Sequence, residues 1–175
     1  CRQDAADAWT LDVADSGAVE QLADHFRQDD IDVAGIVHLL PLRTETRFED
    51  LNIDGWDRCN RQQVKGLFHL ARAFAADIRQ AGEGGAAWVI AVTKLGGGLG
   101  STADAQTSLL PSQGGIAGLI KTLALEWTST HCKLVDLDDA TAGNPSLVAT
   151  VLLDEMAQQP RREEVEVGYV DGERM

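Results

Sequence analysis

The stretch AAWVIAV, residues 86–92, is central to the fold of this 175-residue sequence. It is almost wholly apolar, and so is VAGIVHLL at residues 33–40. A strand that is covered on both faces, as in a parallel sheet with helices on each side, has such a near-continuous apolar run. Both runs are followed by segments with helical periodicity, and this alternation predicts an α/β fold.

The same alternation continues along the chain. Strand patterns occur at residues 9–13, 33–40, 86–92, 133–137 and 163–170. Helical patterns occur at residues 16–26, 54–79, 112–127 and 146–158, with Ser16 and Asp54 as capping residues and Pro145 in a first turn. We therefore predict a truncated Rossmann-like domain over residues 1–175. It should have a parallel sheet of about five strands and helices on both faces.

Composition excludes several classes of protein. The net charge of −13 disfavours binding to nucleic acid, and no apolar run is long enough to span a membrane. No signal peptide is recognisable, and Cys1, Cys59 and Cys132 are far apart without a CxxC pair. We expect a reduced, cytoplasmic chain without a zinc site. Because the sequence begins at Cys1 rather than Met, we expect it to be a piece of a longer protein.

The sequence lacks the glycine turn that holds a dinucleotide pyrophosphate. Neither GxGxxG nor GxxxGxG follows the first predicted strand. LGGGLGS at residues 95–101 does follow a strand, but the next predicted helix begins about a dozen residues later. No helix N-terminus would therefore lie behind a bound phosphate. We expect a flexible loop here rather than a phosphate cradle, and we predict no cofactor-binding residues.

The stretch PSQGGIAGLIKTLALEW, residues 111–127, resembles the helix that carries catalysis in short-chain dehydrogenases and reductases. That resemblance implies a tyrosine and, four residues later, a lysine, but the two places hold Leu109 and Gln113. Ketone reduction needs an acid that protonates the developing alkoxide. The one tyrosine, Tyr169, is followed four residues later by Glu173, so no other register supplies the pair.

The remaining catalytic places of that resemblance are also altered. Gln63 stands where such reductases have an asparagine or lysine. Lys65 is two residues away, about 200° around a helix. Only Thr93, at the end of its strand, could mimic the hydroxyl that steadies the carbonyl oxygen. An ordinary β-branched residue at a strand end explains Thr93 equally well.

Other chemistries have little support. GxSxG is missing, and Ser101 and Ser112 have no histidine adjacent in sequence. Three carboxylates lie at or just after the end of a predicted strand, where α/β folds place ligands: Asp136, Asp138 and Asp139. They could form a magnesium site, but the pattern favours a solvated acidic loop. The histidines lack metal-ligand spacing: His25, His38, His69 and His131. We predict no catalytic and no metal-binding residues.

Several segments, in order, resemble the structural, non-catalytic subdomain of the ketoreductase in type I polyketide synthases. They are GIVHLLPL (35–42), AWVIAVTKLGG (87–97), residues 111–127, CKLVDLD (132–138) and EEVEVGYVDGERM (163–175). The segment GGIAGLIKTLALEW, residues 114–127, is similar in sequence to the corresponding part of the iterative synthases that make polyunsaturated fatty acids or enediynes. The resemblance covers nearly the whole chain and implies a supporting role, with no cofactor bound by this segment.

The same resemblance implies partners. A catalytic subdomain in the same polypeptide would bind NADPH and reduce a β-ketoacyl chain carried on an acyl carrier protein. We expect the contact near the last strand, where Val165, Val167 and Tyr169 share one face. Two alternatives remain. One is an active short-chain dehydrogenase/reductase fragment that binds NADP, and the other is a docking module for a carrier protein.

Overall fold

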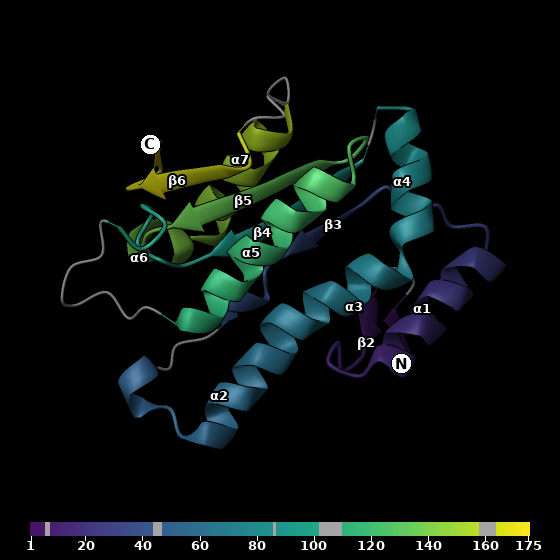
Figure 1. Cartoon of the computed structure of the whole chain (residues 1–175), viewed down its shortest axis with the longest axis horizontal. Coiled ribbons are helices and arrows are strands. Elements are labelled where there is room, and N and C mark those ends of the chain that lie inside the picture. Colours follow the sequence, from purple (N-terminus) through teal and green to yellow (C-terminus); the bar gives the residue numbers. More distant parts are fainter. Residues whose placement is uncertain (6–7, 44–46, 86, 102–109, 158–163) are drawn as a thin grey trace.

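The computed structural model describes residues 1–5, 8–43, 47–85, 87–101, 110–157 and 164–175. Its main sheet has five strands in sequence order (Figure 1): β3 (Gly35–His38), β4 (Trp88–Thr93), β5 (His131–Leu137), β6 (Glu166–Val170) and β7 (Glu173–Arg174). The first four strands are parallel, and the two-residue β7 is antiparallel to β6. The predicted α/β class and the mostly parallel sheet of about five strands are confirmed.

Strand β4 lies inside the sheet, between β3 and β5. Its four central residues, Val89, Ile90, Ala91 and Val92, have no exposed surface. Alternate side chains of a strand point to opposite faces, so complete burial requires cover on both sides. The apolar run quoted first above is therefore explained by its central place in the sheet.

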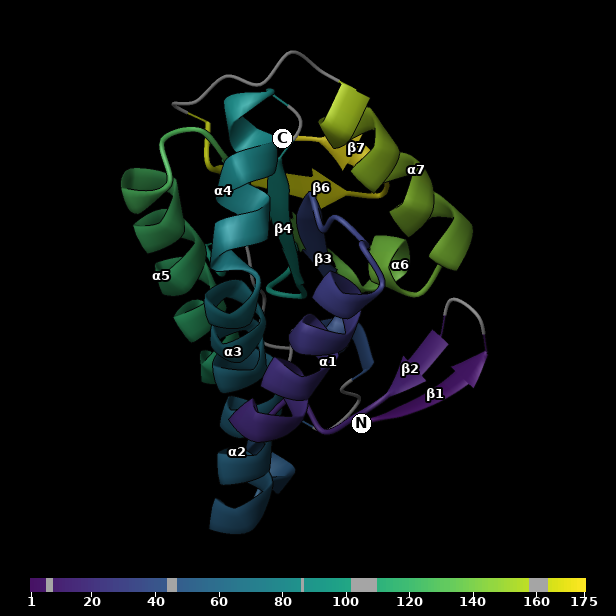
Figure 2. The ribbon, with the colours of Figure 1, turned by 90° about the vertical axis from the view of Figure 1, so that its right-hand side faces the viewer.

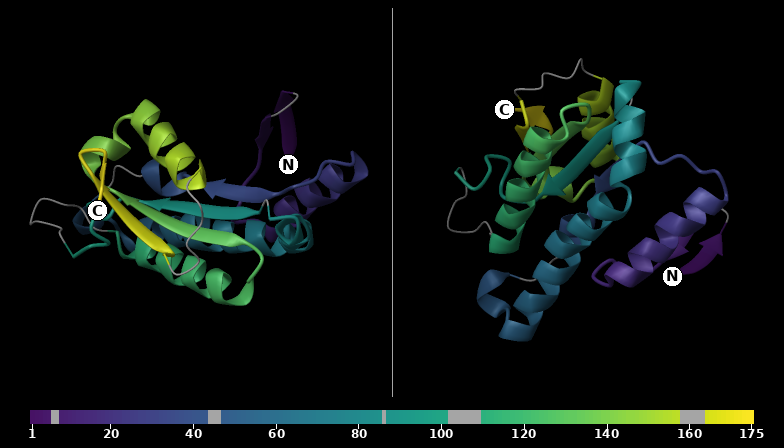
Figure 3. Two further views of the ribbon diagram at one scale, coloured as in Figure 1. Left: turned by 90° about the horizontal axis from the view of Figure 1, so that it is seen from above. Right: turned by 45° about the vertical axis from the view of Figure 1, so that its right-hand side comes forward.

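Helices cover both faces of the sheet (Figure 2). One core cluster receives side chains from α1 (Ser16–Gln28), α3 (Gly66–Ala73), α4 (Ala75–Glu83) and α5 (Pro111–Glu126). The other cluster is closed by α7 (Pro145–Ala157), which follows the short α6 (Asp139–Ala142). Seen from above in Figure 3, the yellow-green α7 and the green α5 lie on opposite sides of the sheet. The predicted two-sided cover is confirmed.

The long helix predicted at residues 54–79 is a composite. It consists of α2 (Ile53–Cys59), a π-helical turn (Asn60–Lys65), α3 and, after a break at Phe74, α4. Asn52 rather than Asp54 caps it, since the Asn52 side chain accepts a hydrogen bond from the Gly55 N–H at 2.8 Å. Phe68, which we expected to be buried, is 48% exposed.

The strand predicted at residues 9–13 is not part of the main sheet. β2 (Ala8–Thr10) instead pairs antiparallel with β1 (Arg2–Ala5) in a separate two-stranded sheet. Figure 2 shows this hairpin standing apart from β3. The backbone groups of β2 form hydrogen bonds with β1, which precedes it directly in the chain. Sequence periodicity does not reveal this pairing. As a consequence, β3 is an edge strand of the main sheet.

Two 3-10 helices, η1 (Leu40–Arg43) and η2 (Phe48–Asp50), connect β3 to α2. In the described part of the chain, no helix combines the length and apolarity needed to cross a membrane. The three cysteines are free, and Cys132 is buried in β5. Burial raises the pKa of the Cys132 thiol to about 12, so it remains protonated at neutral pH.

Candidate functional site

The carboxyl ends of β4 and β5 form the edge of the sheet where α/β folds bind ligands. Thr93 ends β4 and is paired in register with Asp136 of β5. Both residues are fully buried, and the Thr93 hydroxyl donates to Asp136 Oδ1 at 2.7 Å. The Thr93 hydroxyl, which we expected could steady a substrate carbonyl, therefore binds an internal carboxylate instead.

The glycine-rich loop after β4 also binds Asp136. The backbone N–H of Leu95 donates to Oδ1 at 2.7 Å, and the backbone N–H of Leu99 donates to Oδ2 at 2.8 Å. Positive φ angles at Gly96, Gly97 and Gly100 turn the backbone around the carboxylate. Such N–H concavities bind anions, and here the protein supplies the anion itself. The loop at residues 95–101, which we expected to be flexible, is thus held to Asp136 by two backbone hydrogen bonds.

This loop is pressed against β6 from one side. A Cβ atom added at Gly97 would lie 2.2 Å from the Tyr169 carbonyl oxygen, and one added at Gly168 would lie 1.8 Å from the Gly97 carbonyl oxygen. Both distances are far below van der Waals contact, so both positions require glycine. The loop is closed against the sheet.

The start of α5 carries the altered catalytic places. Leu109 lies outside the described residues. Gln113 is 2% exposed, and its Oε1 accepts a hydrogen bond from the Lys94 backbone N–H at 2.5 Å. Ser112 donates from its hydroxyl to Oε1 of Gln63, which lies in the buried face of the π-helical turn, at 3.2 Å. These amides tie α5 to β4 and to the π-helix, and neither carries a charge that could lower the pKa of an acid.

The three carboxylates after β5 have separate partners. Asp136 is buried as described, and Asp138 caps α6 by accepting the Thr141 N–H at 2.9 Å. Asp139 is exposed and pairs with Lys94 Nζ at 2.9 Å. The prediction of a solvated acidic loop is therefore wrong for the buried Asp136 and correct for the exposed Asp139. Among the described residues, no group of three or more His, Cys, Asp or Glu could hold a metal ion.

Tyr169 belongs to a buried ionic cluster at the C-terminal part of the sheet. Its hydroxyl donates to Glu155 Oε1 at 2.6 Å, and Lys133 Nζ lies 2.7 Å from Glu155 Oε2. Arg174 Nε also donates to Glu155 Oε1, at 2.6 Å. Burial, and then the Glu155 carboxylate, raise the pKa of Tyr169. A catalytic tyrosine needs the opposite shift, which a neighbouring ammonium would provide.

Sequence reasoning missed Glu155, although a signal was present. Glu155 falls on the same helical stripe as Val148, Val151 and Leu152, all of which are buried. A carboxylate on an apolar stripe predicts a buried cationic partner, because an unpaired buried charge is very unfavourable. Lys133, the first residue of the strand pattern at residues 133–137, is that partner.

The remaining sequence candidates also have structural places. The Ser101 hydroxyl donates to the Gly98 carbonyl oxygen at 2.5 Å inside the glycine-rich loop. His38 is 3% exposed at the end of β3, and burial lowers its pKa to about 4. His38 is therefore neutral near pH 7. Lys65 is exposed on the helix surface.

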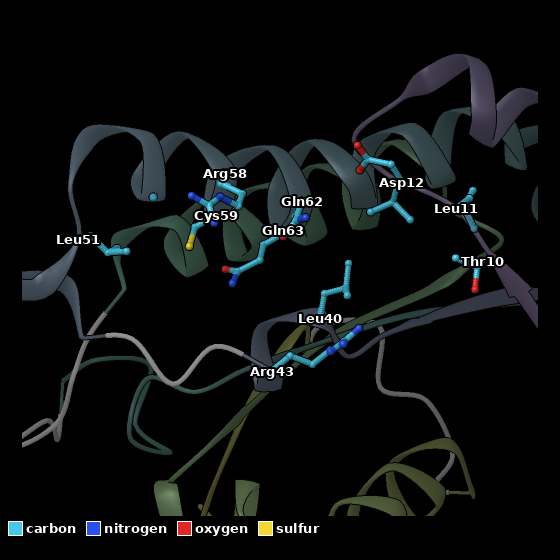
Figure 4. A pocket seen from close by; sticks show the side chains of 12 residues that line it. Thr10, Leu11, Asp12, Leu40, Arg43, Leu51, Arg58, Cys59, Gln62 and Gln63 are labelled. Atoms are coloured by element: carbon cyan, nitrogen blue, oxygen red, sulfur yellow. The ribbon is translucent and has the colours of Figure 1, made fainter. Parts of the chain in front are cut away.

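A cavity of about 630 Å³ lies between the turn after β2, the turn after β3 and the helix α2 with its π-helical extension. In Figure 4, Arg58, Cys59 and Gln62 line it from the helix, and Arg43 lies across from them. Its one glycine, Gly55, is inside α2. A pyrophosphate cradle needs its glycines at a strand-to-helix turn, so the cavity lacks that geometry.

Comparisons with known proteins give the following similarities. The sequence profile of a family described as enoyl-(acyl carrier protein) reductase matches residues 2–135. A curated relative, the highly reducing polyketide synthase alnA of Emericella nidulans, is 27% identical over 99 residues, which are 57% of this chain. The matched part spans only 4% of the length of that synthase.

Solved structures share the fold. An apo SCOR enzyme from Clostridium thermocellum superposes with a TM-score of 0.72 at 14% identity, covering 94% of this chain and 71% of that one. A metagenomic short-chain oxidoreductase in complex with NADP gives a TM-score of 0.70 at 19% identity, covering 93% and 73%. At such low identity the likeness concerns the fold alone.

Proposed function

Because the chain belongs to the enoyl-(acyl carrier protein) reductase family of the short-chain dehydrogenase/reductase superfamily, we propose that it is a non-catalytic member. Specifically, it is the structural half of a polyketide synthase ketoreductase. It stabilises a catalytic subdomain that uses NADPH to reduce a β-ketoacyl chain on an acyl carrier protein. The segment itself binds no cofactor and supplies no catalytic or metal-binding residue.

One observation carries the proposal. Thr93, at the end of β4, has the hydroxyl that could mimic the catalytic one, and it donates its hydrogen bond to the buried Asp136. In a working reductase that hydroxyl must point to the substrate carbonyl. The amide of Gln113 likewise binds the Lys94 backbone instead of a cofactor or an acid. Side chains at the catalytic places thus hold the fold together.

The synthase context rests on the relative that is named a highly reducing polyketide synthase. Such a chain is many times longer than the matched part, as expected for a supporting unit among other domains. The rival hypothesis of an active reductase fragment requires an acid from outside the segment. No specific contact favours the rival hypothesis of a carrier-protein docking module.

We expect this chain to associate with the separately expressed catalytic ketoreductase subdomain of its parent synthase. A ligand that binds only the folded state at about 100 times its Kd stabilises by about 2.7 kcal/mol, so the melting temperature of the mixture should rise by several degrees. NADPH-dependent reduction of a β-ketoacyl thioester should appear in the mixture and exceed that of either part alone. Calorimetry and absorbance at the nicotinamide band measure these effects.

The control is a folded Rossmann-like protein of similar negative charge, which should leave the catalytic subdomain unchanged. Absence of association together with unchanged melting would contradict the supporting role. Binding of the isolated acyl carrier protein to this chain, without the catalytic subdomain, would favour the docking module instead.

A further inference from the structure

The backbone at Leu99 has a conformation that leucine rarely adopts. Its φ angle is 55°, in the left-handed region, where the Cβ atom of a side chain crowds the backbone. Two other described residues besides glycine have a positive φ, and both are aspartates, which tolerate this region better: Asp30 and Asp171. Leucine keeps such a conformation only where its surroundings hold it there. The contacts of Leu99 therefore show what fixes this part of the loop.

The carboxylate of Asp136 holds Leu99. The Leu99 N–H donates to Oδ2 at 2.8 Å, while the Leu95 N–H and the Thr93 hydroxyl both donate to Oδ1 at 2.7 Å. Three donors thus converge on both oxygens of one side chain. Asp136 lies on β5, 37 residues further along the chain than Leu99, and has no exposed surface. The loop is therefore folded around an anion that another element supplies.

Neutral donors alone bind this carboxylate. Within the part of the chain that the structure describes, Asp136 has no ion pair, and the nearby Lys94 directs its ammonium group to Asp139. Concave arrays of backbone N–H groups bind anions through their partial charges, so they need no cation. All three hydrogen bonds go to the carboxyl group. This recognition therefore does not require that the carboxylate be attached to the chain.

The space around the carboxylate is small. The loop cannot widen toward β6, because a Cβ atom added at Gly97 would already lie 2.2 Å from the Tyr169 carbonyl oxygen. Two acceptor oxygens in one plane, as in a carboxylate, match the three donors. The site therefore fits a small planar carboxylate and is too confined for a nucleotide.

We propose that residues 93–99 form a carboxylate-binding site whose ligand, in the native chain, is the side chain of Asp136. Asp136 does within the chain what a bound anion does in a ligand-dependent loop, since it fixes the loop against the sheet. The inference goes beyond the supporting role and does not depend on the identity of a partner. It follows that a free carboxylate can replace the side chain once that side chain is removed.

The test is Asp136→Ala, which removes the carboxyl group and leaves the three donors around an empty space. This variant should be less stable than the wild type and should regain stability from sodium formate, which matches the removed group in size. Because formate would bind the folded state, the folding equilibrium constant should rise about tenfold when the formate concentration is about nine times its Kd. Urea denaturation in formate and in chloride at equal ionic strength measures this rise. Acetate, larger by a methyl group, should act more weakly.

The matched control is Asp136→Asn. Its amide group has nearly the size of the carboxyl group and fills the space, but its NH2 group meets donors instead of acceptors. This variant should also be destabilised, yet formate should stabilise it no more than it stabilises the wild type. General effects of the salt act on all three chains and cancel in the comparison.

Two outcomes with the variants overturn the inference. One is an equal effect of formate on the alanine and asparagine variants. The other is an alanine variant that is unfolded in chloride and stays unfolded, by circular dichroism, in up to about 0.5 M formate. Hydrogen exchange on the wild type is an independent readout: the Leu95 and Leu99 amides should exchange at least about 100-fold more slowly than in an unstructured peptide. Exchange at the rate of an unstructured peptide would overturn the inference without any variant.

Discussion

Gly168→Ala should lower the free energy of unfolding by at least about 3 kcal/mol. The new Cβ would lie 1.8 Å from the Gly97 carbonyl oxygen, which is a backbone atom and not the flexible end of a side chain. The loop cannot retreat without losing the Leu95 and Leu99 hydrogen bonds to Asp136. Chemical denaturation measures the loss, and the melting temperature should fall by about 6–12 °C.

The matched control is Gly118→Ala. Gly118 is exposed in α5, and a Cβ atom there meets no atom within 4 Å. Since alanine is the better helix former, this variant should be stabilised by up to about 1 kcal/mol. Equal stability of Gly168→Ala and the wild type would mean that the loop does not lie against β6.

Glu155→Ala should lower the free energy of unfolding by about 3–5 kcal/mol, because it leaves Lys133 buried without its main counter-charge. The side chain of Glu155 has no exposed surface, and that of Lys133 is 9% exposed. The neighbouring Asp154→Ala is the control, since Asp154 is exposed on the same helix. It should change stability by less than about 0.5 kcal/mol, and similar losses in both variants would contradict a buried cluster.

The Glu155 carboxylate should also make the free energy of unfolding depend on pH. Burial alone would raise the pKa of Glu155, but hydrogen bonds from Arg174, Lys133 and Tyr169 outweigh it and lower the pKa to about 2, from 4.5. The folded pKa is lowered, so the stabilisation is complete above pH 4.5 and is lost as the pH falls toward 2. The loss should reach about 3 kcal/mol in the wild type. Glu155→Gln should lack this part of the acid dependence in unfolding titrations.

Periodicity and composition were sufficient to predict the order of the elements. The apolar runs in β3 and β4 correctly indicated a sheet with helices on both faces, and Pro145 correctly placed the start of α7. The strand near residue 9 was assigned to the wrong sheet, because an alternating pattern does not say which strand is its neighbour. The π-helical turn likewise leaves no mark in the apolar pattern.

The sequence indicated which places depart from the reductase pattern, but not which contacts the side chains at those places make. Counting positions identified Gln113 as an altered catalytic place and Thr93 as a residue that could mimic the missing hydroxyl. Gln113 binds the backbone of Lys94, and Thr93 binds Asp136. In both pairs the two residues are far apart in the sequence, so the sequence does not reveal the contact. We grouped Asp136 with Asp138 and Asp139 because the three are close together in the sequence. Tertiary packing, which the sequence pattern does not show, decides that Asp136 alone is fully buried.

The interface expected at the last strand needs correction. Val167 and Tyr169 are buried against the cluster closed by α7, at 3% and 5% exposure, so their face is already used inside the chain. Apolar alternation predicted burial correctly but could not tell an internal partner from an external one. The uncovered apolar strand is β3, at the opposite edge of the sheet.

A calorimetric titration of NADPH into the purified 175-residue chain decides whether this segment supports a catalytic partner without holding a cofactor of its own. With Thr93 and the glycine-rich loop both bound to Asp136, we expect no saturable heat up to about 1 mM, the upper end of the range usual for enzyme substrates. Saturable binding in the micromolar range would contradict it, because a chain that holds the cofactor this tightly is more than a support.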